Sequence, residues 1–286
     1  MINNTHILAV VSVIFLCPAA GGILAGLNRK LHSYLQYRHG ASIFQPFYDT
    51  IKLLGKNGST SIPFQMQFIL LNIVFIMFAA YLILMGQDLL LIIACVAFAE
   101  FSRIVAIMLA KSPFYQLNAR KETINAIVYI TLLLLAVVNI KLITGSYMTR
   151  SIYAASSPLI YDIPLTYLVI IFAILLKLGR APFDYCAPGI RNRGSLERLN
   201  TGFSRTALAL INISSWYETI LLMFLASVFI AKPLWIGIFI SLLIYFLFTL
   251  IDSLTPTSTW KWTVTFWWPV AGLVSIINVV WMCLGS

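Results

Sequence analysis

Three ionisable side chains lie inside long apolar stretches of the sequence, where charges are otherwise rare. Glu100 and Arg103 fall near the middle of one apolar run, and Glu218 falls about midway along another, beside Trp216 and Tyr217. A charge at the centre of a membrane helix costs about 2.5–3.5 kcal/mol on insertion scales, and such residues usually serve a function. Carboxylates in this setting could take up and release a proton.

The spacing of these residues leaves two interpretations open for each. Glu100 and Arg103 are three positions apart on one helix face, so they could form an ion pair that locks helix packing or a station on a proton path. Glu218 has no cation near it in the sequence, which favours proton exchange over a carboxylic acid that only bridges helices. Glu122 starts a further apolar run after two basic residues and suits a solvated helix start; it is the fourth candidate.

The composition is that of a membrane protein. The 286-residue chain is 60% hydrophobic and 10% charged, with a mean hydropathy of +0.93. Soluble domains are about half apolar and a quarter charged, so lipid must cover much of this chain. The net charge of +10 does not indicate nucleic acid, because the basic residues gather in the loops between apolar runs.

The chain is expected to be an all-α, polytopic membrane domain that covers residues 1–286. Each apolar run is close to the roughly 20 residues that a bilayer requires. We expect eight membrane spans, at residues 6–28, 65–86, 89–110, 123–143, 160–178, 206–230, 234–251 and 264–284.

The distribution of basic residues predicts the orientation. Of the 19 lysines and arginines, fifteen (Lys177 among them) follow spans one, three, five and seven, whereas three lie on the other side. The positive-inside rule then places both termini outside the cell membrane and these connections in the cytoplasm. The expected cytoplasmic docking loops are residues 29–62, 111–121, 178–205 and 252–263.

The first of these loops contains a short amphipathic helix. In residues 45–56, Pro46 suits a first helical position, and Phe47, Ile51 and Leu54 share one face. Such a helix lies in the membrane interface. It could seal the bilayer surface, frame an opening for an amphipathic substrate, or support a partner subunit.

The sequence carries no pattern that would bind a cofactor or metal. Its four cysteines are scattered without a CxxC pair, and its three histidines do not form a ligand set. Motifs for phosphate binding, dinucleotide binding and nucleophilic catalysis are missing as well. We therefore expect no catalytic residue and no bound cofactor in this chain.

Five loop segments carry a family resemblance. They are LNRKLHSYLQYRHGASIFQPFYDTIKLLGK at 27–56, KSPF at 111–114, NARKE at 118–122, RAPFD at 180–184 and TGFSRTALAL at 201–210. In this order and spacing, they resemble the membrane subunit that respiratory complex I shares with energy-converting nickel–iron hydrogenases. The chain's length is more similar to the formate hydrogenlyase and hydrogenase-4 type than to the longer complex I subunit.

The resemblance implies a docking and coupling role without catalysis. The implied partners are a hydrogenase-like large subunit and a small iron–sulfur subunit on the cytoplasmic side, together with antiporter-like membrane subunits and lipid. Iron–sulfur clusters and a nickel–iron centre would belong to these partners, and a quinone could bind in the same region. The residues implied to dock the partner or frame the loops are Arg38, Gln45, Pro46, Asp49, Lys52, Arg180, Pro182, Phe183 and Asp184.

One loop departs from the family pattern. The family has a run of glutamates after its Pro-Phe-Asp, whereas Asp184 is followed here by neutral residues and Arg191. Docking through 178–205 is therefore favoured over proton access through that loop. Coupling would run through Glu100, Glu122 or Glu218, or would be lost. The alternatives are a stand-alone secondary transporter with a Glu100/Arg103 site, and a purely structural anchor.

Overall fold

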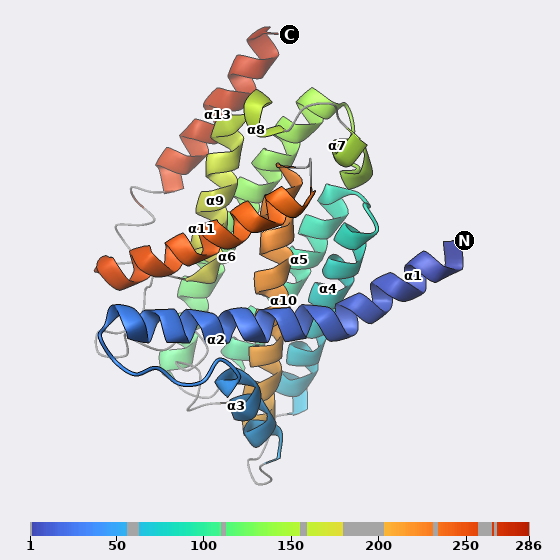
Figure 1. Ribbon diagram of the computed structural model, residues 1–286. Coiled ribbons are helices and arrows are strands. Elements are labelled where there is room, and N and C mark those ends of the chain that lie inside the picture. Colours follow the sequence, from blue (N-terminus) through green and yellow to red (C-terminus); the bar gives the residue numbers. More distant parts are fainter. Residues whose placement is uncertain are drawn as a thin grey trace.

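The computed structural model is a bundle of helices (Figure 1). It describes residues 2–55, 63–109, 113–154, 159–179, 203–230, 234–256, 265 and 268–285. Within these residues no β-strand forms, and the only bridge pairs Asp88 with Met148. The helices are α1 (Ile2–Val11), η1 (Ser12–Leu16), α2 (Cys17–Leu35), α3 (Gln45–Leu54), α4 (Pro63–Leu84), α5 (Leu89–Met108), α6 (Pro113–Thr144), α7 (Thr149–Ala154), α8 (Leu159–Asp162), α9 (Pro164–Leu178), α10 (Arg205–Val228), α11 (Leu234–Leu254) and α13 (Trp268–Gly285).

The expected all-α membrane fold is confirmed. Six helices of the described chain are long and apolar enough to cross a membrane: His6–Leu35, Phe64–Leu84, Leu89–Met108, Ala119–Thr144, Arg205–Val228 and Trp235–Leu254. Two shorter apolar helices, Pro164–Leu178 and Trp268–Trp281, coincide with the other two expected spans. The first span is longer than predicted because its helix continues to Leu35, seven residues beyond the expected end.

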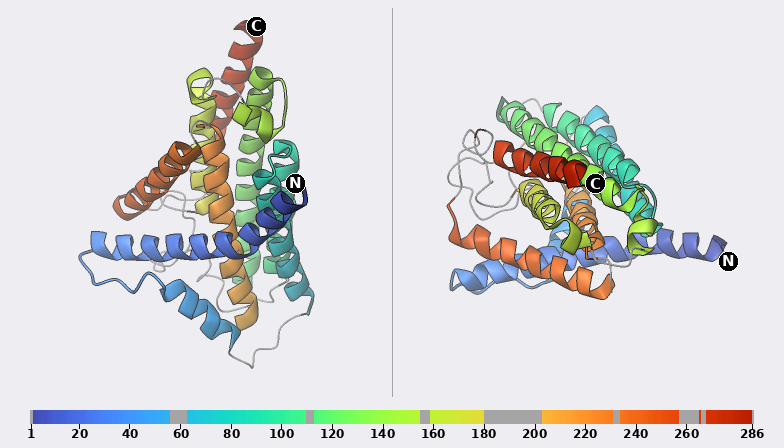
Figure 2. Two further views of the ribbon diagram at one scale, coloured as in Figure 1. Left: turned by 45° about the vertical axis from the view of Figure 1, so that its right-hand side comes forward. Right: turned by 90° about the horizontal axis from the view of Figure 1, so that it is seen from above.

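The helices divide into an upright bundle and two that cross it. Helices α4, α5, α6, α9, α10 and α13 run roughly along one axis, whereas α2 and α11 lie across that bundle at a steep angle (Figures 1 and 2). Helix α10 is central and packs against α2, α3, α4, α9 and α11. We call the end of the bundle where α9 ends and α6 and α10 begin the loop face, and the end near Thr144 and Pro164 the opposite face.

Pro18 determines the shape of the crossing helix. A proline lacks the N–H that would bond the carbonyl four residues earlier, and its ring crowds that carbonyl. The π-helical turn η1 lies directly before α2 and absorbs this distortion. The carbonyl left without its helical partner is that of Ile14, and the Tyr217 hydroxyl of α10 donates to it at 3.2 Å. Helix α10, which α2 crosses, therefore supplies the hydrogen bond that the Ile14 carbonyl lacks within its own helix.

Glycines allow α2 to approach its neighbours closely. A Cβ atom on Gly21 would lie 2.5 Å from the backbone oxygen of Trp216 in α10, and one on Gly26 would lie 1.8 Å from the backbone oxygen of Ile43. Neither distance is possible for a real side chain, so the crossing depends on glycine at both positions. Phe47 of α3 then packs on the Trp216 ring with 5.1 Å between ring centroids.

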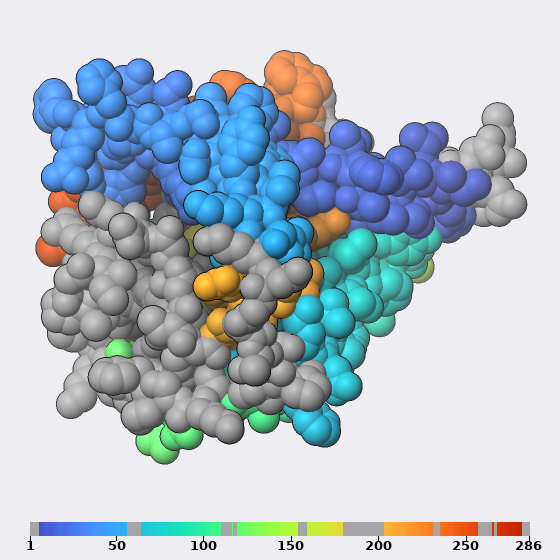
Figure 3. Space-filling model, turned by 90° about the horizontal axis from the view of Figure 1, so that it is seen from below, coloured from blue at the N-terminus to red at the C-terminus, as the bar shows by residue number. Residues whose placement is uncertain are grey.

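Helix α3 forms where the sequence predicts it, but its faces differ from the expectation. Pro46 and Thr50 are buried against the bundle, and Phe47 also turns inward. Ile51 and Leu54 are exposed by 65% and 46%, as an amphipathic helix at a membrane interface requires. Figure 3 shows α2 and α3 along one side of the loop face.

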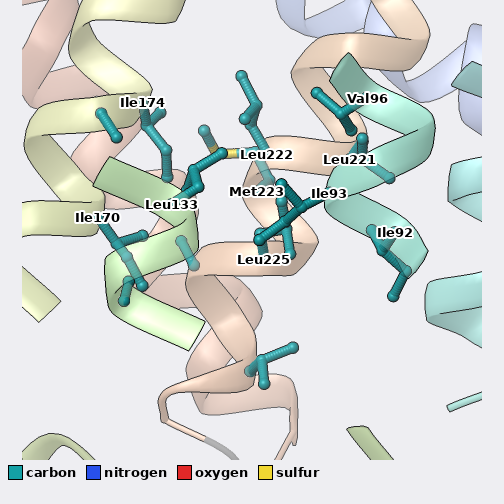
Figure 4. Packing of buried hydrophobic residues seen from close by; sticks show 14 of the residues in the cluster. Ile92, Ile93, Val96, Leu133, Ile170, Ile174, Leu221, Leu222, Met223 and Leu225 are labelled. Atoms are coloured by element: carbon teal, nitrogen blue, oxygen red, sulfur yellow. The ribbon is translucent and has the colours of Figure 1, made fainter. Parts of the chain in front are cut away.

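The main core lies between α5, α6, α9 and α10. Leu133, Ile170, Ile174, Leu221 and Leu222 are among its members and interdigitate at the centre of the bundle (Figure 4). These five side chains are apolar, and they fill the bundle on the side of Lys177 and Glu218 that faces away from the loop face. The charged residues lie directly beneath them.

Candidate functional site: a buried charge cluster

Five charged side chains from four helices meet inside the bundle. They form what we call the charge cluster: Glu100 and Arg103 from α5, Glu122 from α6, Lys177 from α9 and Glu218 from α10. The side chains of Glu100 and Lys177 are 1% and 3% exposed, whereas Glu122 is 32% exposed. The cluster is therefore buried at its centre and reaches the surface through Glu122.

Arg103 contacts all three carboxylates. Its Nη2 donates to Glu100 Oε2 at 2.6 Å and lies 3.6 Å from Glu122 Oε2. Its Nη1 lies 3.8 Å from Glu218 Oε2. The planar guanidinium carries five N–H donors in a fixed fork, so it can bond to several oxygens at once.

Lys177 completes the cluster from the other side. Its ammonium donates to Glu100 Oε1 and lies 3.3 Å from Glu218 Oε2. It also lies 5.2 Å from the centroid of the Tyr129 ring, which adds a cation–π contact. Gly179, in the left-handed conformation at φ 58°, ends α9 and leaves Lys177 in its last turn. A cation there also interacts favourably with the helix dipole.

Hydrogen bonds to neighbouring residues fix the backbone around the cluster. Asn72 of α4 donates to the carbonyl of Ala99, the residue before Glu100, at 2.7 Å. The Ser214 hydroxyl, one turn before Glu218, donates to the Asn72 side-chain oxygen. Asn125 of α6 donates to the carbonyl of Leu176, the residue before Lys177, at 3.1 Å. Each polar link joins two helices next to a charged residue, so the charges are held by the scaffold as well as by each other.

The cluster has more acids than bases. Among the residues that the structure describes, three carboxylates face two cations, so this set carries one net negative charge when fully ionised. An unbalanced charge inside a low-dielectric bundle is costly. One bound proton, or one small monovalent cation, makes the cluster neutral. Glu218 Oε1 is buried without a hydrogen-bond partner among the described residues, and it can accept a proton without breaking the contact of Oε2 with Lys177.

The structure brings together the four predicted ion-path residues. The expectation that Glu218 has no nearby cation is wrong, because Lys177 and Arg103 approach it from other helices. Glu122 is not the start of its helix, since α6 begins at Pro113 and places Glu122 against Arg103. The surroundings of these carboxylates arise from tertiary contacts that one helix's sequence cannot show.

Lys177 belongs to the cluster, although the sequence prediction places it among the basic residues of a cytoplasmic loop. It is buried in the last turn of α9. Its apolar neighbours Leu175, Leu176 and Leu178 are the sequence feature that could have indicated its burial. A lysine flanked by leucines on both sides is embedded in apolar surroundings, whereas a loop lysine usually has polar neighbours.

The docking candidates divide between described and undescribed residues. Gln45 donates to Asp49 Oδ1 at 2.9 Å, and Arg29 donates to Asp49 Oδ2 at 3.0 Å, so Asp49 ties α3 to α2. Arg38 and Lys52 are exposed. The four candidates of the third cytoplasmic loop lie outside the described residues: Arg180, Pro182, Phe183 and Asp184.

Long apolar helices, packed around buried carboxylates and cations, define a polytopic membrane protein with ionisable groups inside its helix bundle. Comparison with known families specifies it further: the family model described as NADH dehydrogenase matches residues 6–283. The chain therefore belongs to the NADH dehydrogenase family.

Comparison with solved structures supports this fold. One matching chain belongs to the membrane-bound sulfane sulfur reductase, an archaeal respiratory membrane complex, with a TM-score of 0.83 and 17% sequence identity. The match covers 97% of this chain and 99% of the other. A search of curated proteins finds no match. At this identity the structural likeness establishes the arrangement of the helices alone.

The contacts of Lys177 yield a prediction about stability. Replacing it by Met leaves Glu100 and Glu218 with Arg103 alone, and loss of one buried partner costs about 3–5 kcal/mol. We expect Lys177→Met to lower the melting temperature of the detergent-purified protein clearly, and a second substitution, Glu218→Gln, to restore part of the loss. Lys141→Met is the control, because Lys141 is exposed and contacts only the Tyr147 ring in the described structure. Equal melting temperatures for Lys177→Met and Lys141→Met would contradict the assigned pairing.

Proposed function

We propose that this chain is the membrane coupling subunit of a complex I-like respiratory complex. In this role it docks a soluble redox module at its loop face and links electron transfer to ion movement through the charge cluster. The observation that carries the proposal is the cluster itself. Among the described residues it has one more carboxylate than cations, and Glu122, 32% exposed, is its most accessible member. Membership in the NADH dehydrogenase family supports a place in a respiratory complex.

The transported ion is a proton in this proposal, and Na⁺ is the alternative. Glu122 receives the ion from the loop face, and Arg103 lies between it and the two deeper carboxylates. When the ion reaches Glu100 or Glu218, the cluster becomes neutral. A change in the charge or position of the docked redox module changes the affinity of the charge cluster for the ion. This change in affinity links ion movement to electron transfer.

The partners follow from the family and the loop pattern. We propose a hydrogenase-like large subunit and a small iron–sulfur subunit at the loop face, with antiporter-like subunits within the membrane. The similar sulfane sulfur reductase is itself a respiratory membrane complex, so the terminal acceptor need not be a proton or a quinone. The loop face is the cytoplasmic side of the cell membrane in this orientation, and both termini lie outside.

The ionisable carboxyl of Glu218 provides the test of coupling. In proteoliposomes that contain the whole complex, Glu218→Gln is expected to abolish ion translocation while the subunits stay assembled and electron transfer continues. A glutamine keeps the shape but cannot release a proton. Asp88→Asn is the matched control, since Asp88 is an exposed carboxylate at the opposite face. Sensitivity to a protonophore or to a sodium ionophore identifies the ion. Unchanged translocation in Glu218→Gln would instead identify a purely structural anchor.

Docking at the loop face has its own test. Arg38 is exposed beside the α2–α3 turn, and charge reversal at an interface rim slows association and alters its salt dependence. We expect Arg38→Glu to reduce the amount of soluble redox subunits that co-purify in mild detergent, most strongly at low salt, because added salt screens an exposed charge. Arg150→Glu, at the opposite face, is the control and should leave their recovery unchanged. If the wild-type chain purifies without soluble partners, the docking proposal fails and a stand-alone transporter is favoured.

A further inference from the structure

A second set of buried polar groups continues from the charge cluster towards the opposite face. We call it the polar ladder: Tyr129 and Asn139 on α6, Thr166 on α9, and Ser275 and Asn278 on α13. These three helices pack against one another in a single junction, as the view from above shows (Figure 2). None of the five side chains belongs to the charge cluster.

Most of the ladder lacks hydrogen-bond partners. The Tyr129 hydroxyl, the Ser275 hydroxyl and both polar atoms of the Asn139 side chain are buried without a partner among the described residues. Asn139 and Ser275 are each 0% exposed. Buried polar groups in folded proteins are satisfied by protein or by ordered water, and an orphaned group costs about 1–3 kcal/mol. Several such groups at one helix junction indicate that water reaches them.

Two hydrogen bonds fix the order of the ladder along the membrane. Asn125 bonds to Leu176 across α6 and α9, and Asn278 donates to Thr166 Oγ1 at 2.5 Å across α13 and α9. Thr166 is eleven residues from Lys177, so the two share one face of α9 about 16 Å apart. Ser275 lies one turn from Asn278 towards the loop face. From the cluster outward, the order is therefore Tyr129, Ser275, the Thr166–Asn278 pair and Asn139.

Together the cluster and the ladder cross most of the bilayer. Glu122 and Asn139 are 17 positions apart on α6, which corresponds to about 25 Å along the helix. A hydrocarbon core is about 30 Å thick. Directly between α5, α9 and α10 the way outward is closed by the apolar core (Figure 4). The ladder also includes Ser275 and Asn278 of α13, and Asn278 bonds to Thr166 of α9.

We propose that the polar ladder is a water-filled exit path that takes a proton from the charge cluster to the opposite face of the membrane, between α6, α9 and α13. This inference rests on the proposed coupling function. The O–H bond of a cluster carboxylic acid breaks, and the proton passes to a water molecule next to Tyr129. It then moves by exchange between waters that the ladder side chains hold. The carboxylate left behind pairs with Lys177 and Arg103, and no group is oxidised or reduced.

Water in the ladder can be detected with single cysteines in the assembled complex. The four native cysteines are first replaced by alanine. Ser275→Cys and Asn139→Cys are then treated with a charged, membrane-impermeant methanethiosulfonate reagent from the opposite face. Ile276→Cys and Val138→Cys are the matched controls, because these neighbours have the same depth but are 49% and 38% exposed on the outer surface of the bundle.

A hydrated ladder predicts labelling at the ladder positions about tenfold faster than at the controls, since only a thiol in contact with water forms the reactive thiolate. Modification of Ser275→Cys should also block proton translocation. Equal labelling of ladder and control positions would overturn the exit path whatever the Glu218→Gln complex does. Fast labelling of the ladder positions, together with full ion translocation by the Glu218→Gln complex, would overturn the coupling function instead. The ladder would then be hydrated but would not carry protons from the cluster.

Discussion

The contact of the Lys177 ammonium with Glu100 and Glu218 is the interaction on which the interior depends. It brings α5, α9 and α10 together at one point, although none of the three could bury its charge alone. Arg103 extends the same set of contacts to α6 through Glu122. Within the described part of the chain, three acids meet two bases, so the fully ionised cluster has one more negative than positive charge. Ionisable groups buried in a membrane bundle are costly and usually serve a function.

The scaffold is arranged to hold this cluster at a fixed depth. Asn72, Ser214 and Asn125 place hydrogen bonds beside the charged positions, and the hydrophobic core packs on the side that faces away from the loop face. Helix α2 crosses α10 at a steep angle, which Gly21 permits because it has no Cβ atom. Tyr217 bonds to the carbonyl that the bend before α2 leaves free within the helix. This crossing brings α3 to the loop face. Helix α3 thus packs directly on α10, the helix that carries Glu218.

The sequence predicted the fold well and the site only in part. Long apolar runs specify spans because the bilayer requires them, and the pattern of residues 45–56 specified α3. Glu100, Arg103 and Glu218 were identifiable because charges inside such runs are costly. Lys177 was missed because charge near a span end is normally a loop feature, and its burial depends on how α9 packs. The partnership of Glu218 with Lys177, across 41 positions of sequence, and the bond of Asn278 to Thr166 follow from packing, which no local pattern encodes.

The central claim is that the charge cluster holds one exchangeable proton. Infrared difference spectra of the purified complex, taken between its oxidised and reduced states in H₂O and in D₂O, test it most directly. The account predicts a protonated carboxyl band that changes with redox state, shifts in D₂O and is lost in Glu218→Gln. A spectrum without a redox-linked carboxyl band, or one unchanged by Glu218→Gln, would contradict it.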